Sequence, residues 1–287
     1  MRRDRKRFRI SDERTVNTFF KENKLVKLLT RSESNTKLLK TAKGNLSVEI
    51  VGLSLSPANI AGGRTNCTGA SAACVRACVG SACGLVTISS HIMESRIQKT
   101  KYMQEHPEEF RRQLNDELRQ ETARAKREGK QLVCRLNVFS DISWELAPWF
   151  IPQAHSGVRF YDYTKVRKRV GNTPDNYALC ASWDERKTSQ DACVRLLKRG
   201  HNVSVAFYEV GPYAGSRAIK QRLPRRYQLQ GTEFNVFDGD ASDLRLPGLD
   251  PEPDSRGYGS VIGLRLKAGS NATREQAIES GFALPVE

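Results

Sequence analysis

Four of the seven cysteines lie in one short segment, NCTGASAACVRACVGSACG, which we call the cysteine loop (residues 66–84). Cys67, Cys74, Cys78 and Cys83 are separated by six, three and four residues. In a reducing compartment, thiolates gathered this closely are typical of a zinc or iron–sulfur site. Structural zinc usually shows two CxxC pairs or an added histidine pair, and neither is present, so the spacing favours an iron–sulfur cluster over zinc. The small residues between the cysteines suit a loop around an inorganic core, and also a buried turn of unliganded cysteines.

The other three cysteines, Cys134, Cys180 and Cys193, lie in apolar stretches and are expected in the core, because free cysteine behaves as a small hydrophobic residue. The N-terminus lacks an apolar signal segment, and no run approaches the roughly 18 consecutive apolar residues of a membrane span. We therefore expect a cytoplasmic protein with reduced thiols and no membrane partner.

Polar residues recur where each predicted strand ends. In parallel α/β folds the ligand site lies beyond the carboxyl ends of the strands, so these residues predict a polar pocket there. We assign catalytic roles to Asp141, Asp162, Lys165 and Asp240. Substrate-binding roles go to Ser182, Asp184, Tyr161 and Tyr163. Taken singly, each polar residue is also explained as a cap of the following helix.

Alternation along a strand decides which side chains share a face. Tyr161 and Tyr163 are two residues apart and share one face, while Asp162 and Thr164 share the other. Either pair can equally be packing.

The elements expected to position these residues alternate between strands and helices. Seven segments rich in Val, Phe, Tyr, Leu and Ile predict buried strands: SVEIVGLSL, QLVCRLNVFSD, VRFYDYTKV, NYALCASWD, NVSVAFYEV, TEFNVFDGD and YGSVIGLRLKA. Residues 88–126 predict one or two long helices, the second starting at Pro107, and DACVRLLKRG predicts a crossover helix. The fold class is therefore α/β, with a parallel sheet curled into a complete or partial (β/α) barrel, or alternatively an open doubly wound sheet. The segment LPGLDPEPDSRGYG predicts a surface loop.

The N-terminal segment is strongly basic. Its first 43 residues hold fourteen Lys or Arg against five Asp or Glu. We expect a basic arm with a short amphipathic helix over residues 15–29, forming residues 1–45, and a single domain over residues 46–287. The opening MRRDRKRFR is either a tail that contacts phosphates or a disordered end that aids solubility.

The whole chain carries a formal net charge of +15. A field of that sign attracts polyanions, so the expected partner is nucleic acid, DNA rather than RNA. Several common activities are excluded, because GGR at residues 62–64 lacks a following GKS or GKT, and no nucleophile elbow, HExxH motif or basic region with heptads is present. The oligomeric state stays open.

An ordered set of segments resembles a known family. LSPANIAG, the three cysteines Cys67, Cys74 and Cys78, LNVFSDISWE, FYDYTKV and FDGD resemble the gene product 88-like proteins of phages and plasmids, from about Leu53 to Lys267. The resemblance implies a mobile-element origin and hence a bacterial host cell. A more distant similarity is to the radical S-adenosylmethionine enzymes, whose three cluster cysteines follow the first barrel strand with CxxxCxxC spacing. That similarity implies a [4Fe–4S] cluster with one open iron for S-adenosylmethionine, and leaves Cys83 spare or as a fourth ligand.

Three hypotheses follow. The first is a cluster-dependent enzyme of a mobile element that acts on nucleic acid or a nucleotide. The second is a replication-initiation or DNA-nicking protein that uses Tyr161 or Tyr163 as nucleophile, although the four histidines are scattered and form no His-x-His pair. The third is a non-catalytic DNA-binding module with a structural metal.

Overall fold

The computed structural model describes residues 27–32, 47–81, 90–209 and 222–286. Cys83, most of the basic arm and most of the helix expected over residues 15–29 lie outside the described residues. Among these residues, no helix combines the length and apolarity needed to cross a membrane.

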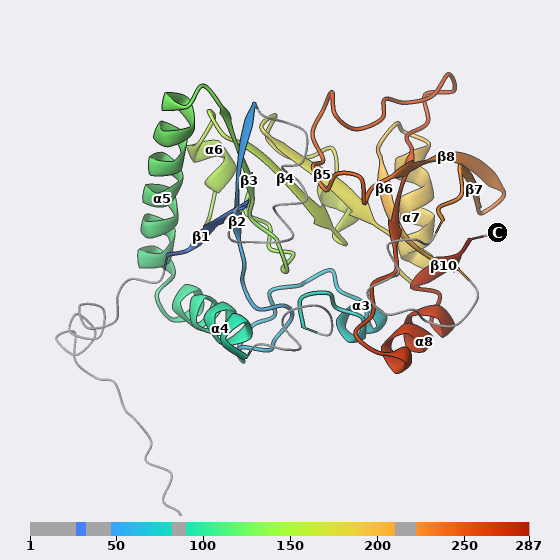
Figure 1. Ribbon diagram of the computed structural model, residues 1–287, viewed down its shortest axis with the longest axis horizontal. Coiled ribbons are helices and arrows are strands. Elements are labelled where there is room, and N and C mark those ends of the chain that lie inside the picture. The colour runs from blue at the N-terminus through green and yellow to red at the C-terminus, as the bar shows by residue number, and fades with distance from the viewer. Residues whose placement is uncertain (1–26, 33–46, 82–89, 210–221, 287) are drawn as a thin grey trace, which may run out of the picture.

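A mixed, mostly parallel sheet forms the centre of the molecule (Figure 1). Its ten strands are β1 (Leu29–Arg31), β2 (Val48–Leu53), β3 (Gln131–Arg135), β4 (Arg159–Thr164), β5 (Tyr177–Ser182), β6 (Val203–Tyr208), β7 (Arg226–Leu229), β8 (Thr232–Asp238), β9 (Val261–Arg265) and β10 (Ala283–Pro285). Their order is β1-β2-β3-β4-β5-β6-β9-β8-β7, with β10 also paired to β6. Only β1–β2 and β7–β8 pair antiparallel among the described strands. The expected α/β protein with a largely parallel sheet is confirmed.

The helices lie around this sheet. They are α3 (Ala72–Arg76), α4 (Ser90–Glu105), α5 (Pro107–Arg127), α6 (Ile151–Ala154), α7 (Lys187–Leu197), α8 (Asn271–Glu279) and the 3-10 helix η3 (Arg167–Arg169). The long helical stretch does divide at Pro107, as predicted, because a proline is tolerated in the first turn and not in the interior. The predicted loop over residues 246–259 contains no helix or strand.

The two faces of the sheet bury different sets of side chains. Phe160 of β4 belongs to the large core that includes Phe110 and Leu114 of α5. Its neighbour Tyr161 belongs to a smaller core on the other face, covered by Leu244 and Leu246. The predicted alternation along this strand is therefore confirmed.

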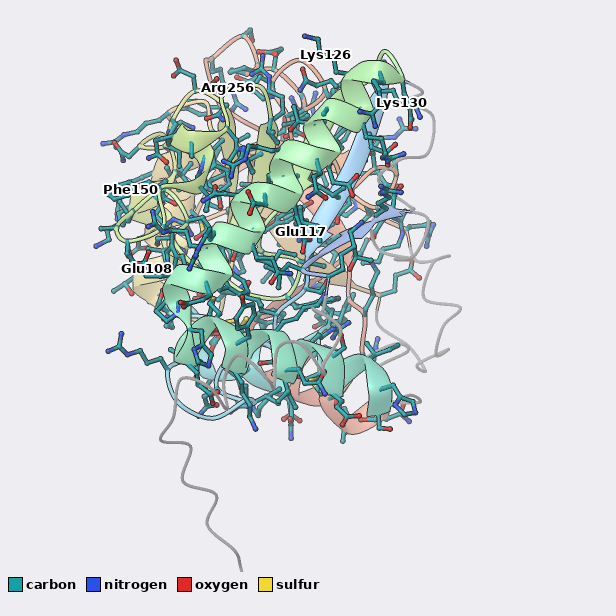
Figure 2. All side chains as sticks on the ribbon, turned by 90° about the vertical axis from the view of Figure 1, so that its left-hand side faces the viewer. Glu108, Glu117, Lys126, Lys130, Phe150 and Arg256 are labelled. Carbon is teal, nitrogen blue, oxygen red and sulfur yellow. The ribbon has the colours of Figure 1, made fainter. Side chains whose placement is uncertain are left out.

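The edge strand β1 is held by a buried carboxylate of α5. The backbone N–H groups of Leu28 and Leu29 donate to the two oxygens of Glu117, at 2.9 and 2.8 Å. Figure 2 shows α5 running along this side of the molecule, with Glu117 near its middle. Leu29, placed at the end of a helix by its sequence pattern, thus begins a strand.

Strand β6 has two different neighbours along one edge. Its first residues, Val203 and Ser204, pair with β5, whereas Ala206, Phe207 and Tyr208 pair with β10. The last strand therefore replaces β5 at the carboxyl end of β6, and it brings α8 to this end of the sheet (Figure 1). Neither α8 nor β10 was anticipated from the sequence.

Candidate functional site

The cysteine loop lies at the carboxyl end of the sheet, after β2 (Figure 1). Cys67 forms a parallel β-bridge with Asp141, which follows β3. The Asp141 N–H donates to the Asn66 carbonyl at 2.7 Å, and the Asn66 side chain donates to the Ser56 carbonyl at 2.8 Å. These bonds fix the start of the loop against the end of β3.

Residues that follow β4 and β5 hold the middle of the loop. The Ser71 hydroxyl donates to Glu185 at 2.7 Å, and the Ala73 N–H at the start of α3 donates to the other Glu185 oxygen at 3.1 Å. Arg186 donates to the Gly69 carbonyl at 2.7 Å. A Cβ atom on Gly69 would lie 2.7 Å from the carbonyl carbon of Lys165, so only glycine allows this close approach.

The three described thiols of the loop influence one another. Burial raises the pKa of Cys67 to about 12, and Cys78 and Cys74 contribute in the same direction. Burial also raises the pKa of Cys74, to which Cys78 contributes in the same direction. All three thiols are free and only partly buried.

Positive side chains surround these thiols. Lys165 lowers the pKa of Cys74, against the larger effect of burial. A hydrogen bond to Asp184 raises the pKa of Arg186, and Cys74 adds a smaller effect of the same sign. On the α4 side, Arg96 donates to the Gly80 carbonyl and stacks 3.8 Å from the centre of the Phe139 ring. Burial lowers the pKa of Arg96 to about 10, and Cys78 opposes that shift.

A site for one metal ion is not formed by these thiols. Within the part of the chain that the structure describes, no three His, Cys, Asp or Glu side chains converge on a position that could hold a metal ion. The predicted ligands Cys67, Cys74 and Cys78 do lie at one edge of the sheet, whereas Cys83 is outside the described residues.

Asp141 is fully engaged as a hydrogen-bond acceptor. The Thr164 hydroxyl and the Lys165 N–H each donate to it at 2.8 Å, and Arg169 donates at 3.0 Å. Arg169 also makes two 2.8 Å bonds to the buried Glu145. Asp141 therefore fixes the backbone that carries Lys165.

Asp162 belongs to the same hydrogen-bond network as Asp141. It is fully buried and accepts from the Asn137 N–H and the Tyr177 hydroxyl, both at 2.8 Å. Arg169 donates to that hydroxyl at 3.3 Å and thus links Asp162 to Asp141. Burial raises the pKa of Asp162 to about 7, although Arg135 and Tyr177 act in the opposite direction.

Ser182 and Asp184 are joined by Arg167, which donates to the Ser182 carbonyl at 2.7 Å and to the Asp184 carboxylate at 2.6 Å. Burial alone would raise the pKa of Asp184, but the bonds from Arg186 and Arg167 outweigh it and hold the pKa well below its usual range. Asp184 also raises the pKa of Cys74, so it lies near the thiols.

The remaining predicted residues lie elsewhere. Tyr161 is fully buried on the opposite face of the sheet, and the Tyr163 hydroxyl donates to Asp243 at 3.0 Å. Burial raises the pKa of Tyr163 well above its ordinary value. Asp240 accepts from the Arg265 N–H and from Lys267, at 2.8 and 2.7 Å. These bonds tie Asp240 to the ends of β8 and β9 and not to the cysteine loop.

Several residues of the site were missed by sequence reasoning. Arg167, Glu185 and Arg186 directly follow strand-end residues that were selected, so extending the same argument by two positions would have found them. Arg96 on α4 and Phe282, whose ring lies 5.3 Å from the Lys165 ammonium, carry no comparable signal.

Comparison with known proteins gives a family match. The sequence profile described as Gene product 88 matches residues 27–283, which is most of the chain. No curated protein and no solved structure matches, so the similarity to radical S-adenosylmethionine enzymes gains no support from these comparisons.

Proposed function

Because the chain belongs to the Gene product 88 family, we propose that it is an iron–sulfur protein of phages or plasmids that acts on nucleic acid. The supporting observation is the group of three mutually interacting thiols at the carboxyl end of a mostly parallel sheet. This is the end at which α/β proteins place their ligand sites. The cytoplasm of a bacterial host is the compartment that keeps such thiols reduced.

The donor set fits a cluster better than a single ion. Thiolates are soft ligands suited to iron–sulfur clusters and zinc. In a cluster each thiolate binds a different iron, so the sulfur atoms need not meet at one point. We propose Cys67, Cys74 and Cys78 as ligands, with Cys83 as a fourth or spare thiol.

The positive side chains also fit this assignment. A buried thiol with a raised pKa stays protonated until a cation binds and displaces the proton. Lys165, Arg186 and Arg96 favour the thiolate form and offset the negative charge of a thiolate-bound cluster. When bound, such a cluster supplies electron transfer or an open iron for a substrate.

The residues of this chain would bind and orient the substrate. Lys165 and Arg186 are cations close to the thiols and are suited to a phosphate group. Asp141 has its oxygens occupied by three donors, so we propose that it positions Lys165. Asp184 holds Arg167 and Arg186 through ion pairs of 2.6 Å.

We also propose that the sheet is a partial barrel. Strands β2, β3, β4, β5, β6 and β9 are neighbours in chain order, as in a (β/α) barrel. A doubly wound sheet reverses its strand order near its middle, whereas here the order follows the chain from β1 to β6 and reverses only beyond it, as β9-β8-β7.

The proposal is tested by purification without oxygen, followed by iron and sulfide analysis and an absorption spectrum. We expect a brown protein, a colourless Cys74→Ala variant, and a brown Cys193→Ala control, because Cys193 is a buried residue of α7. Binding or processing of nucleic acid is then compared between these proteins. Stoichiometric zinc without iron, or undiminished activity in the colourless variant, would overturn the proposal.

A DNA-binding module with a structural metal is the second candidate. It is favoured by the hydrogen bonds that tie the cysteine loop to residues after β3 and β5, since a metal there would only reinforce them. In that case Lys165→Gln would weaken DNA binding, and neither the wild type nor the variant would show catalytic turnover. The nicking alternative is less well supported, because Tyr161 is fully buried and the Tyr163 hydroxyl, whose pKa burial raises, donates to Asp243.

A further inference from the structure

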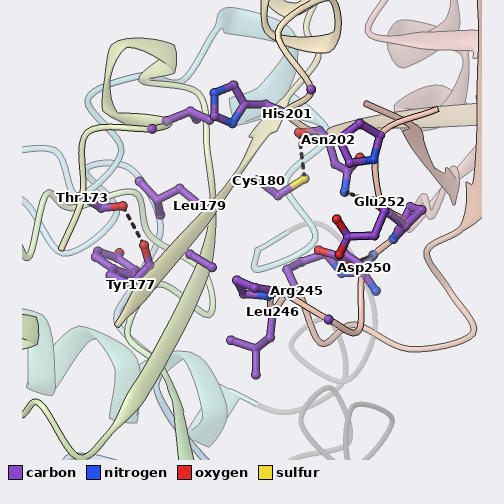
Figure 3. A pocket seen from close by; sticks show the side chains of 18 residues that line it. Thr173, Tyr177, Leu179, Cys180, His201, Asn202, Arg245, Leu246, Asp250 and Glu252 are labelled. Carbon is purple, nitrogen blue, oxygen red and sulfur yellow. Dashed lines mark hydrogen bonds and ion pairs between the residues drawn. The ribbon is translucent and has the colours of Figure 1, made fainter. Parts of the chain in front are cut away.

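A cavity of about 310 Å³ lies at the amino ends of β5 and β6, at the end of the sheet opposite the cysteine loop (Figure 3). Its lining includes Tyr177 and Leu179 of β5, His201 before β6, and the loop that carries Arg245 and Asp250. The volume lies at the lower end of the range of roughly 300–1,000 Å³ that is typical of small-molecule sites. The proposed function makes no use of this end of the sheet.

One wall of the cavity carries a buried ion pair. Arg245 is 2% exposed, and its Nη1 lies 2.8 Å from an Asp250 oxygen. Its Nη2 donates to the Ser242 carbonyl. Its Nε and Nη1, and the Asp250 Oδ1 of the ion pair, make no hydrogen bond among the described residues. A buried guanidinium N–H without a partner is costly, so a ligand that accepts from it would gain affinity.

The pair defines the chemistry of that ligand. Arg245 supplies a donor and Asp250 an acceptor side by side, and the opposite charges largely cancel. Such a pair complements a group with an acceptor beside a donor better than it complements a bare anion. An amide edge, C=O beside N–H, has this pattern, and among nucleobases guanine and uracil carry it.

The other walls suit a flat ring. Leu179, Leu246 and Pro251 provide apolar surface around the pair. In Figure 3, Arg245 and Leu246 lie together, with Leu179 and Tyr177 on the β5 side of the cavity. A few placed polar groups within an apolar lining are the usual composition of a small-molecule site.

Positive charge lies beside the cavity. Lys198 and Arg199 are exposed and directly precede Gly200, which lines it. Burial and the charge of Arg199 both lower the pKa of His201, so Arg199 acts on the His201 side of the cavity. A phosphate attached to a bound base would find a counter-charge there.

We propose that this cavity binds a nucleotide whose base presents an amide edge to Arg245 and Asp250 and whose phosphate lies near Arg199. The site is separate from the cysteine loop, and the inference does not depend on the metal.

Calorimetric titration of the full chain with guanosine monophosphate, adenosine monophosphate and guanosine tests the proposal. We expect guanosine monophosphate to bind more tightly than adenosine monophosphate, because the N1–H and amino groups of guanine can both donate to the Asp250 carboxylate while O6 accepts from Arg245, whereas adenine offers the carboxylate a single donor group. Asp250→Asn should weaken guanosine monophosphate binding about tenfold or more. Arg199→Gln, an exposed substitution, should weaken guanosine monophosphate but not guanosine.

The matched control is Glu275→Gln, an exposed residue of α8 at the other end of the sheet, which should leave all three affinities unchanged. Thermal melting of each variant checks that the fold is kept. Equal binding of the adenine and guanine nucleotides, no binding of either, or unchanged affinities in both Asp250→Asn and Arg199→Gln would overturn the proposal.

Discussion

At the scale of single residues, two buried carboxylates, Asp162 in β4 and Asp184 just after β5, differ in charge because their neighbours differ. Asp162 accepts hydrogen bonds mainly from neutral groups, Asn137 and Tyr177, and burial raises its pKa to about 7. Asp184 is equally buried, but Arg167 and Arg186 hold its pKa well below the usual range. Asp184 is therefore ionised throughout the physiological range, while Asp162 changes its charge near neutrality.

The titration of Asp162 predicts a pH dependence of stability. Its pKa is higher in the folded protein than in the unfolded chain, so the folded state binds the proton more tightly. The resulting contribution is fully present below about pH 4 and is lost as the pH rises through about 7. The lost stability is about 1.4 kcal/mol for each pH unit that separates the pKa of the folded protein from that of the unfolded chain.

Urea unfolding of the wild type and of Asp162→Asn between pH 4.5 and 8 checks this prediction. We expect the difference in free energy of unfolding, wild type minus variant, to fall as pH rises. The exposed Asp175→Asn serves as a control with a constant difference. A pH-independent difference for Asp162→Asn would contradict the assigned titration.

At the scale of elements, the cysteine loop depends on a close approach to the end of β4. A Cβ on Gly69 would lie 2.7 Å from the Lys165 carbonyl carbon and 2.9 Å from the Val166 N–H nitrogen. These are backbone atoms that Asp141 holds in place through its bond to the Lys165 N–H. A larger residue at position 69 would therefore clash with the backbone after β4.

Gly69→Ala should therefore displace the loop and lower the free energy of unfolding by about 1–3 kcal/mol. Gly157→Ala is the matched control, because its Cβ would meet nothing within 4 Å. Denaturant unfolding of both variants measures the effect. Equal free energies of unfolding for Gly69→Ala and Gly157→Ala would show that the close approach of Gly69 to the end of β4 does not constrain the loop.

How far the sequence predicts the elements depends on their length and their partners. The strands β2, β3, β4, β5, β6, β8 and β9 are long apolar runs and were all expected. The short strands β1, β7 and β10 exist because a neighbour pairs with them, and three or four residues carry no periodicity of their own. The antiparallel pairs at the two edges were missed for this reason.

The same reasoning applies to the site. Sequence position sufficed to place Asp141, Lys165 and Asp184 at the end of the sheet that carries the cysteine loop, since the carboxyl ends of parallel strands lie together. It was not enough for Asp240, whose bonds to Lys267 and the Arg265 N–H keep it at the ends of β8 and β9. It also could not show that Asp141, Asp162 and Asp184 are buried whereas Lys165 and Asp240 are partly exposed, because burial depends on neighbours distant in sequence.

At the scale of the whole molecule, the positive charge is unevenly distributed. The net charge is +15, and the first 43 residues contribute +9 of it, fourteen basic against five acidic residues. On the surface of α5, by contrast, Arg111, Arg112 and Arg119 are each paired with an acidic residue three positions earlier. Affinity for DNA should therefore come mainly from the N-terminal segment and little from this helix.

Replacing Arg2, Arg3 and Arg5 with Gln should weaken DNA binding. It should also make the slope of log K against log salt shallower by about 0.9 for each phosphate that the arm ceases to neutralise. The same replacement of the three α5 arginines removes equal charge and should have a smaller effect. Fluorescence anisotropy at several salt concentrations compares the two variants. Equal reductions in affinity would assign the binding to net charge alone.

The shared edge of β6 has a consequence for how the protein is made. Ala77 of the cysteine loop packs with Ala277 of α8 and Ala283 of β10, two elements that follow strands β1 to β9 in the chain. The principal cores can form from the earlier strands, but the packing around Ala77 in the cysteine loop is complete only when α8 and β10 have folded. A chain in which α8 and β10 have not yet folded would therefore leave Ala77 and the adjacent part of the cysteine loop uncovered on this side.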